Sequence, residues 1–184
     1  MYNRDVEDAL IEYLDFGIHL PNRKNHRLPA DTYAGEDCIF FFTICASKKT
    51  APFVDPNLAD AVIESLLWRR KQTKWALYCL MPDHLHVVLK LEESITSAVN
   101  AGCRGVVPRS VLDQIGDFKK YTTTQLWWKQ GHTGHLWQSN SYDRVVQLDE
   151  NPESVVKYVL NNPVRKGLAE HWTEYPFCAV VDHI

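Results

Sequence analysis

Apolar and polar positions follow two periods along the chain, one of two residues and one of about 3.6. Residues 39–46 (IFFFTICA) are β-branched and aromatic on both faces, which predicts a buried strand. Residues 74–81 (KWALYCLM) predict a second strand, and residues 84–91 (HLHVVLKL) a third. The Pro-Asp pair between them favours an antiparallel hairpin. A fourth strand is expected over residues 143–148.

Helical spacing of apolar residues predicts two helices between these strands. The first is expected over about 58–71, with Asp55 or Asn57 as its cap. The second is expected from about 109 to 128. The resulting order, β-α-β-β-α-β, predicts an α+β fold with a ferredoxin-like antiparallel sheet. An additional C-terminal helix follows the last strand, and a proline at 163 is expected to stop it.

The length and composition predict one ordinary globular domain. The chain has 184 residues, 45% hydrophobic residues and a net charge of −3. A short amphipathic helix with an acidic outer face is predicted within residues 1–22 as an N-terminal extension, and residues 23–184 form the expected domain. There is no membrane-length apolar run and no signal-like start, so we expect a cytoplasmic location. Five cysteines without a C-x-x-C pair argue against a disulfide framework or a structural zinc site.

The third predicted strand carries two histidines, His84 and His86, separated by one residue. In an extended strand both imidazoles point to the same face, while Leu85, Val87 and Leu89 point to the other. Two neutral imidazoles on one face can bind one metal ion. The alternative is a pair of ordinary histidines on a half-exposed strand.

The C-terminal helix offers groups that would complete such a site. Its buried stripe is formed by valines and a leucine between 155 and 160, and Tyr158 lies about 130° from the centre of that stripe. Asn162, four residues later, is nearly in line with Tyr158. Two imidazoles and an amide oxygen could hold a divalent cation, and a tyrosine hydroxyl beside it could attack phosphorus. A surface tyrosine and a C-terminal asparagine are the alternative interpretation.

Several motifs in order resemble one family. The HLH of MPDHLHVVL is similar to the His-hydrophobic-His motif of the HUH single-tyrosine transposases. The stretches LWQSNSYDRVV and YVLNNPVRKGL, the start RKNHRLP…FFTIC and the end EYPFCAV resemble the REP-associated tyrosine transposase branch. The similarity covers roughly residues 23–180. The first 20 residues have no obvious counterpart, the net charge is acidic, and Asp83 stands where that family commonly has asparagine.

This resemblance implies a nuclease that binds a DNA hairpin and cleaves the adjacent single strand. His84, His86 and Asn162 match the metal ligands, the ion being Mg²⁺ or Mn²⁺, and Tyr158 matches the nucleophile. The reaction would leave a 5′-phosphotyrosine and a free 3′-hydroxyl, and a second transesterification would rejoin strands without ATP. The partner would be single-stranded or hairpin DNA from repeated palindromic elements, which implies association with the nucleoid. Relatives act as monomers or homodimers.

Other residues are candidates for contact with nucleic acid. The basic ones could contact phosphates, and a tryptophan could stack on an unpaired base; they are Arg23, Arg27, Lys119, Lys120, Trp137, Arg165 and Lys166. Tyr142 and Tyr121 are alternative nucleophiles, but neither has a ligand-type residue four positions later. Two other functions remain open: a catalytically silent binder of palindromic DNA, and a metal-dependent hydrolase that uses water.

Overall fold

A computed structural model describes residues 39–69, 75–90, 110–131, 133–146 and 152–181 of the chain. The predicted N-terminal extension, its boundary with the domain, and the candidate phosphate contacts Arg23 and Arg27 lie outside the described residues.

The fold is built on a five-stranded antiparallel sheet with strand order β4-β1-β3-β2-β5. The strands are β1 (Ile39–Cys45), β2 (Trp75–Met81), β3 (His84–Lys90), β4 (Tyr142–Val146) and β5 (Cys178–Val180). The first four have the order of a ferredoxin-like sheet, which confirms the predicted fold class. Sequence periodicity did not predict β5, because a strand of three residues is too short to show a period of two.

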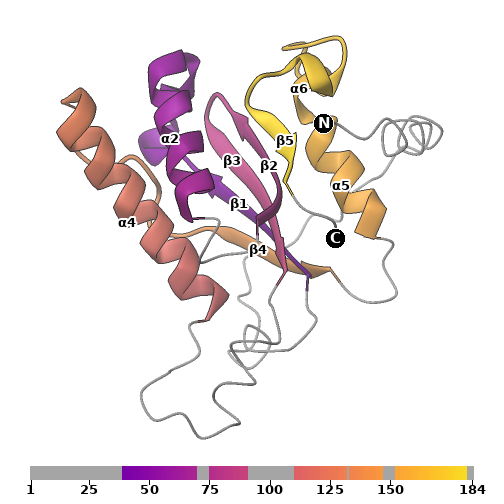
Figure 1. Cartoon of the computed structure of the whole chain (residues 1–184), viewed down its shortest axis with the longest axis horizontal. Helices are drawn as coiled ribbons and strands as arrows, with labels where there is room; N and C mark the ends of the chain where they lie inside the picture. Colours follow the sequence, from indigo (N-terminus) through magenta and orange to yellow (C-terminus); the bar gives the residue numbers. More distant parts are fainter. Residues whose placement is uncertain (1–38, 70–74, 91–109, 132, 147–151, 182–184) are drawn as a thin grey trace, which may run out of the picture.

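The helices lie on both faces of the sheet. The α-helices are α2 (Pro56–Arg69), α4 (Val111–Gln130), α5 (Pro152–Leu160) and α6 (Asn162–Arg165), and short 3-10 turns cover Ser47–Lys49, Pro52–Val54 and Trp172–Glu174. Figure 1 shows α2 and α4 on one side of the sheet and α5 and α6 on the other. Within the described residues, no helix is long and apolar enough to cross a membrane.

Local capping defines the helix ends. The Asp55 carboxylate accepts a hydrogen bond from the backbone N–H of Asn57 at 2.9 Å, so the aspartate rather than the asparagine caps α2. Ser110 and Asp113 form a reciprocal capping box at the start of α4. The C-terminal helix differs from the expectation. It ends at Leu160, and Pro163 lies in the first turn of α6, where a missing N–H costs nothing.

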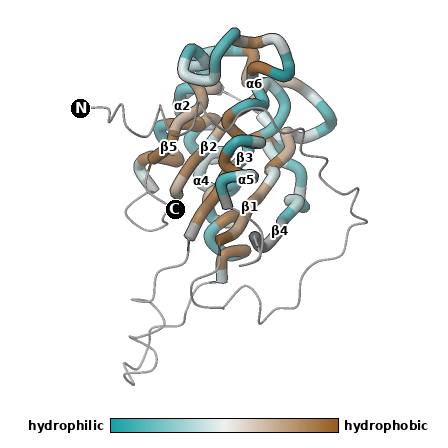
Figure 2. The backbone as a smooth tube through the Cα atoms, turned by 90° about the vertical axis from the view of Figure 1, so that its right-hand side faces the viewer, coloured by the Kyte–Doolittle hydropathy of each residue, from teal (hydrophilic) through white to brown (hydrophobic). Residues whose placement is uncertain are grey.

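Alternation along the strands divides the apolar side chains between two cores. Leu85, Val87 and Leu89 of β3 face α2 and α4, together with Phe40 and Phe42 of β1. Val88 faces the opposite way, where β2 residues pack against Val155, Val159 and Leu160 of α5. The inner strands are mostly brown in Figure 2, as expected for strands buried on both faces. The two histidines therefore lie on the α5 face.

Candidate active site

His84 and His86 point their Nε2 atoms at each other. These two nitrogens lie 3.0 Å apart, and the ring centroids are separated by 4.5 Å. His86 is 4% exposed, because it occupies the central strand between Thr43 of β1 and Cys79 of β2. His84 is half-buried, one step nearer the hairpin turn. The face shared by the two histidines, predicted from their spacing, is confirmed by this geometry.

The other nitrogen of each ring has its own partner. Thr43 Oγ1 lies 2.9 Å from His86 Nδ1, and Asp83 Oδ1 lies 2.7 Å from His84 Nδ1. A group that holds Nδ1 fixes the ring orientation and leaves Nε2 as the coordinating atom, which is the usual arrangement around metal-binding histidines. Asp83, the departure from the family pattern, thus supplies a carboxylate to one of the two rings.

Burial keeps His86 in its neutral form. Removal from water, assisted by the neighbouring His84, lowers the pKa of His86 to about 3. A neutral imidazole has the free lone pair that a metal ion needs.

Helix α5 brings Tyr158 against this pair. The Tyr158 ring meets the His86 ring edge to face at a centroid distance of 5.8 Å, and the Phe41 ring at 6.1 Å. The guanidinium carbon of Arg165 lies 5.3 Å from the centre of the Tyr158 ring. Tyr158 is half-buried, in keeping with its predicted position outside the apolar stripe of the helix. Residues some seventy positions apart in the sequence therefore form one cluster.

Asn162 lies just beyond α5 and is 6% exposed. Its Nδ2 donates a hydrogen bond to the backbone carbonyl of Tyr158 at 2.9 Å, one helical turn earlier. With the NH₂ group engaged, the amide oxygen is the atom left to act as a ligand. Within the described residues, no set of three His, Cys, Asp or Glu side chains could hold a metal. The amide oxygen of Asn162 is a further type of ligand that a divalent cation accepts.

The donor set fits a divalent cation with open positions. Two nitrogens 3.0 Å apart, each about 2.1 Å from one ion, subtend about 90° at it, the angle between neighbouring octahedral positions. The amide oxygen suits Mg²⁺ and Mn²⁺, whereas imidazole is also a common ligand of zinc and iron. A site with so few protein ligands leaves room for phosphate oxygens, as in many Mg²⁺ sites.

The predicted nucleic-acid contacts are placed differently from one another. Arg165, Lys166 and Lys120 are exposed. The Lys119 ammonium instead donates to three backbone carbonyls, those of residues 138, 139 and 140, and to Ser141 Oγ. It therefore holds a loop of its own chain.

Trp137, predicted to stack on an unpaired base, is instead buried. Its ring is 5% exposed, packs against Phe53 at 5.0 Å and Phe118 at 5.9 Å, and donates its Nε1–H to Thr122 Oγ1 at 2.7 Å. No ring face is open to a base, because the side chain is packed in the core between α4 and the turn Pro52–Val54.

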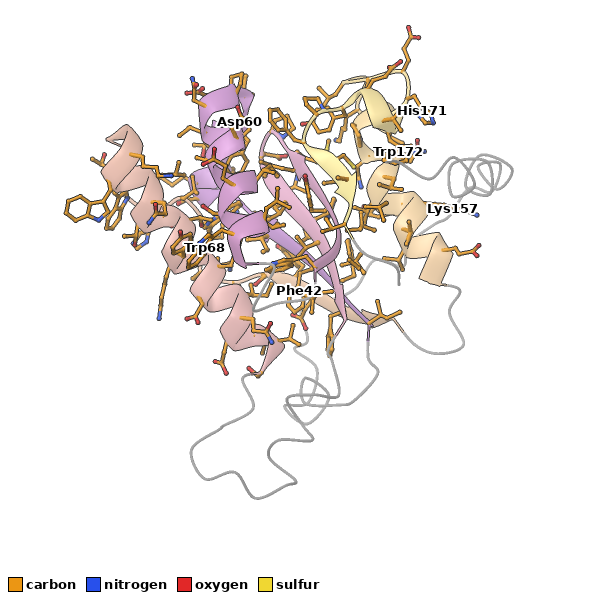
Figure 3. The ribbon with its side chains drawn as sticks, in the orientation of Figure 1. Phe42, Asp60, Trp68, Lys157, His171 and Trp172 are labelled. Carbon is orange, nitrogen blue, oxygen red and sulfur yellow. The ribbon has the colours of Figure 1, made fainter. Side chains whose placement is uncertain are left out.

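The two alternative tyrosines lie on opposite sides of the sheet. Tyr121 of α4 stacks on Trp68 of α2 with a centroid distance of 4.8 Å, away from the histidines. Figure 3 shows Trp68 beside α4, across the sheet from Lys157 and Trp172. Tyr142 is paired with Thr43, so it lies on the histidine face.

The sequence did not identify Thr43 as the partner of His86. Its only signal is a threonine in an otherwise apolar strand, IFFFTIC. The contact depends on the β1–β3 register, which places Thr43 directly opposite His86.

An antiparallel ferredoxin-like sheet with a histidine pair and a helix-borne tyrosine on one face is the arrangement expected of single-tyrosine transposases. Comparison with known proteins supports that likeness. A Haemophilus influenzae protein provisionally named a REP-associated tyrosine transposase is 24% identical over 147 residues, covering 76% of this chain and 77% of the relative. An uncharacterized protein of the same organism is 23% identical over 168 residues, covering 80% and 91%. No family model matches the chain.

A solved structure shows the same fold. The structure of a REP-associated tyrosine transposase bound to a REP hairpin superposes with a TM-score of 0.54 and 15% identity, covering 85% of this chain and 82% of that one. The resemblance predicted from the motifs is thus confirmed: the chain is similar in sequence and fold to REP-associated tyrosine transposases.

Proposed function

We propose that the protein is a metal-dependent, single-stranded DNA endonuclease and strand transferase that acts next to DNA hairpins through a 5′-phosphotyrosine. The observation that carries the proposal is the contact of Tyr158 with His86, whose Nε2 faces that of His84 at 3.0 Å. The similarity to REP-associated tyrosine transposases, one of them solved with a REP hairpin, supports hairpin DNA as the partner.

His84, His86 and Asn162 would hold Mg²⁺ or Mn²⁺. When bound, the cation would polarise the phosphodiester and offset the negative charge that develops during phosphoryl transfer. Asp83 and Thr43 orient the two rings. Arg165, exposed beside Tyr158, offers a positive charge to the strand at the point of attack.

The proposed chemistry is an exchange of phosphodiester bonds. The Tyr158 hydroxyl oxygen attacks phosphorus, the bond from phosphorus to the 3′-oxygen breaks, and the 5′-phosphate becomes attached to the tyrosine. The phenol loses one proton and the leaving 3′-oxygen gains one, so the step is balanced in protons. Attack by a 3′-hydroxyl on the phosphotyrosine reverses this exchange on a second strand, which explains why no ATP is required.

The decisive test is capture of the covalent adduct. The protein is incubated with Mn²⁺ and a hairpin oligonucleotide with labelled single-stranded flanks, then resolved on a denaturing gel. Wild type should form a labelled adduct. Tyr158→Phe should form none and still bind the hairpin, and Tyr121→Phe, altered on the opposite face of the sheet, should behave as wild type. An undiminished adduct in Tyr158→Phe would exclude Tyr158 as the nucleophile.

The same experiment separates the alternatives. Hairpin binding without an adduct or cleavage across several metals and flanking sequences identifies a silent DNA binder. Cleavage that persists in Tyr158→Phe without any adduct identifies a hydrolase that uses water.

A further inference from the structure

Within the described residues, the histidine-bearing face of the sheet is covered over β2 and β3 and stays partly exposed at β1 and at Tyr142 of β4. Helix α5 packs over β2 and β3. The side chains of β1 on this face, Phe41, Thr43 and Cys45, are only half-buried, whereas those that face α2 and α4 are fully buried. Beyond β1, Tyr142 of the edge strand β4 is 56% exposed. These side chains of β1, together with Tyr142, therefore form a partly exposed surface beside the candidate active site.

Strand register places Tyr142 in line with the site. Tyr142 is directly opposite Thr43, and Thr43 is directly opposite His86, so these residues form one row across three strands. Directly opposed residues in antiparallel strands point to the same face. Two strand spacings separate Tyr142 from His86, roughly 10 Å between backbones. A nucleotide whose phosphate lies at His86 can reach that far with its sugar and base, or with those of its neighbour.

The chain just before Tyr142 is held firmly. The Lys119 ammonium donates to the carbonyls of Gln138 and Asn140 at 3.1 Å and of Ser139 at 3.3 Å, and to Ser141 Oγ at 3.2 Å. The backbone N–H of Gln138 also donates to the carbonyl of Cys45 at 2.9 Å. The start of β4 is therefore fixed relative to β1. An aromatic ring on such a support loses little conformational freedom when it binds a flat ligand.

We propose that Tyr142 is a stacking platform for an unpaired base next to the phosphodiester that is cut. This inference rests on the proposed function for its choice of ligand. An exposed aromatic ring in the same row as His86, two strands from it, suits a base whose face is free, which single-stranded but not duplex DNA offers. Tyr142 would position the substrate and would not react with it. Lys119 would act through Tyr142 by holding the preceding loop.

The test measures binding without metal, so that cleavage does not interfere. Affinity is determined for a fluorescent hairpin with single-stranded flanks, and for the same oligonucleotide with an abasic site at each flank position in turn. Tyr142→Ala should weaken binding about tenfold, the value of one base–aromatic stack. Tyr142→Phe should bind as wild type, because the ring supplies the stacking. The matched control is Trp68→Ala, which removes a ring 57% exposed on the opposite face and should have no effect.

The abasic series identifies the base. At one flank position, loss of the base should weaken wild type about as much as Tyr142→Ala does, and the two changes together should be no worse than either alone. Unchanged binding by Tyr142→Ala, or fully additive effects at every position, would overturn the platform. So would an equal loss in Tyr142→Phe, which would show that the hydroxyl is what matters.

Failure of the proposed nuclease activity can be told apart from failure of the Tyr142 proposal. If the nuclease proposal fails, wild type binds the hairpin but forms no adduct when Mn²⁺ is added. The effect of Tyr142→Ala on binding is measured without metal and is therefore independent of that result. Wild type that does not bind the flanked hairpin at all would overturn both proposals.

Discussion

Thr43 and His86 face each other across β1 and β3, with Thr43 Oγ1 2.9 Å from His86 Nδ1. The threonine fixes the imidazole so that Nε2 points towards His84. We therefore predict that Thr43→Val, which keeps the shape and removes the hydroxyl, lowers Mn²⁺ affinity about 10- to 100-fold. Isothermal titration calorimetry measures the change. Thr124→Val, at an exposed position of α4, is the control; equal affinities for the two variants would show that Thr43 does not orient the ligand.

His84 should be required for metal binding. His84→Ala removes one of two imidazole ligands, and we expect Mn²⁺ affinity to fall at least 100-fold, with folding unchanged because the ring is half-buried near a turn. The control is His171→Ala, at the start of the turn Trp172–Glu174. Mn²⁺ binding that survives in His84→Ala would mean that the histidine pair is not the metal site.

Arg165 should contribute one phosphate contact. It is exposed, with its guanidinium over the Tyr158 ring. Arg165→Gln is expected to weaken hairpin binding and to reduce the slope of log affinity against log salt by about one. Lys157→Gln is the control, since the Lys157 ammonium is paired with the Glu153 carboxylate, one turn earlier on α5, at 3.9 Å. Identical salt slopes for wild type and Arg165→Gln would show that Arg165 does not contact a DNA phosphate.

Trp137 should affect stability and not DNA binding. Trp137→Phe keeps the packing against Phe53 but removes the donor to Thr122, so we expect a loss of about 1–3 kcal/mol in the free energy of unfolding. Urea denaturation measures the loss, and hairpin affinity should stay within twofold of wild type. A large loss of affinity in a fully folded variant would restore Trp137 as a base contact.

Tyr175 should make stability depend on alkaline pH. Burial, and then the nearby thiols of Cys79 and Cys178, raise its pKa to about 12, and its hydroxyl donates to the carbonyl of Leu80 at 2.9 Å. The folded-state pKa lies above the unfolded value of about 10. The contribution of Tyr175 is therefore complete below pH 10 and is lost as the pH rises towards 12.

The contribution of Tyr175 is isolated by comparing wild type with Tyr175→Phe in urea denaturation at several pH values. At pH 8 the variant should be less stable by about 1 kcal/mol, because the hydrogen bond is lost. The difference should shrink above pH 10. A difference that stays constant to pH 11 would contradict the assigned shift.

Much of the fold could be read from the sequence because it depends on local periodicity. Alternation in HLHVVLK put His84 and His86 on one face and Leu85, Val87 and Leu89 on the other, and the structure places them so. The order of strands and helices predicted a ferredoxin-like sheet. The spacing of Tyr158 and Asn162 put both beside the apolar stripe of α5, where Tyr158 contacts His86.

Tertiary structure decided the contacts within the site and the burial of its candidate residues, because these depend on which distant residues meet. No local pattern pairs Thr43 with His86 or Tyr142 with Thr43; both follow from the register of β1 with its neighbours. Trp137 and Lys119 looked like surface contacts in sequence, yet one fills the core and the other holds a loop. The sequence by itself determined the chemical groups and the faces on which they lie. Only packing determined which of them meet, since register and burial depend on the whole sheet.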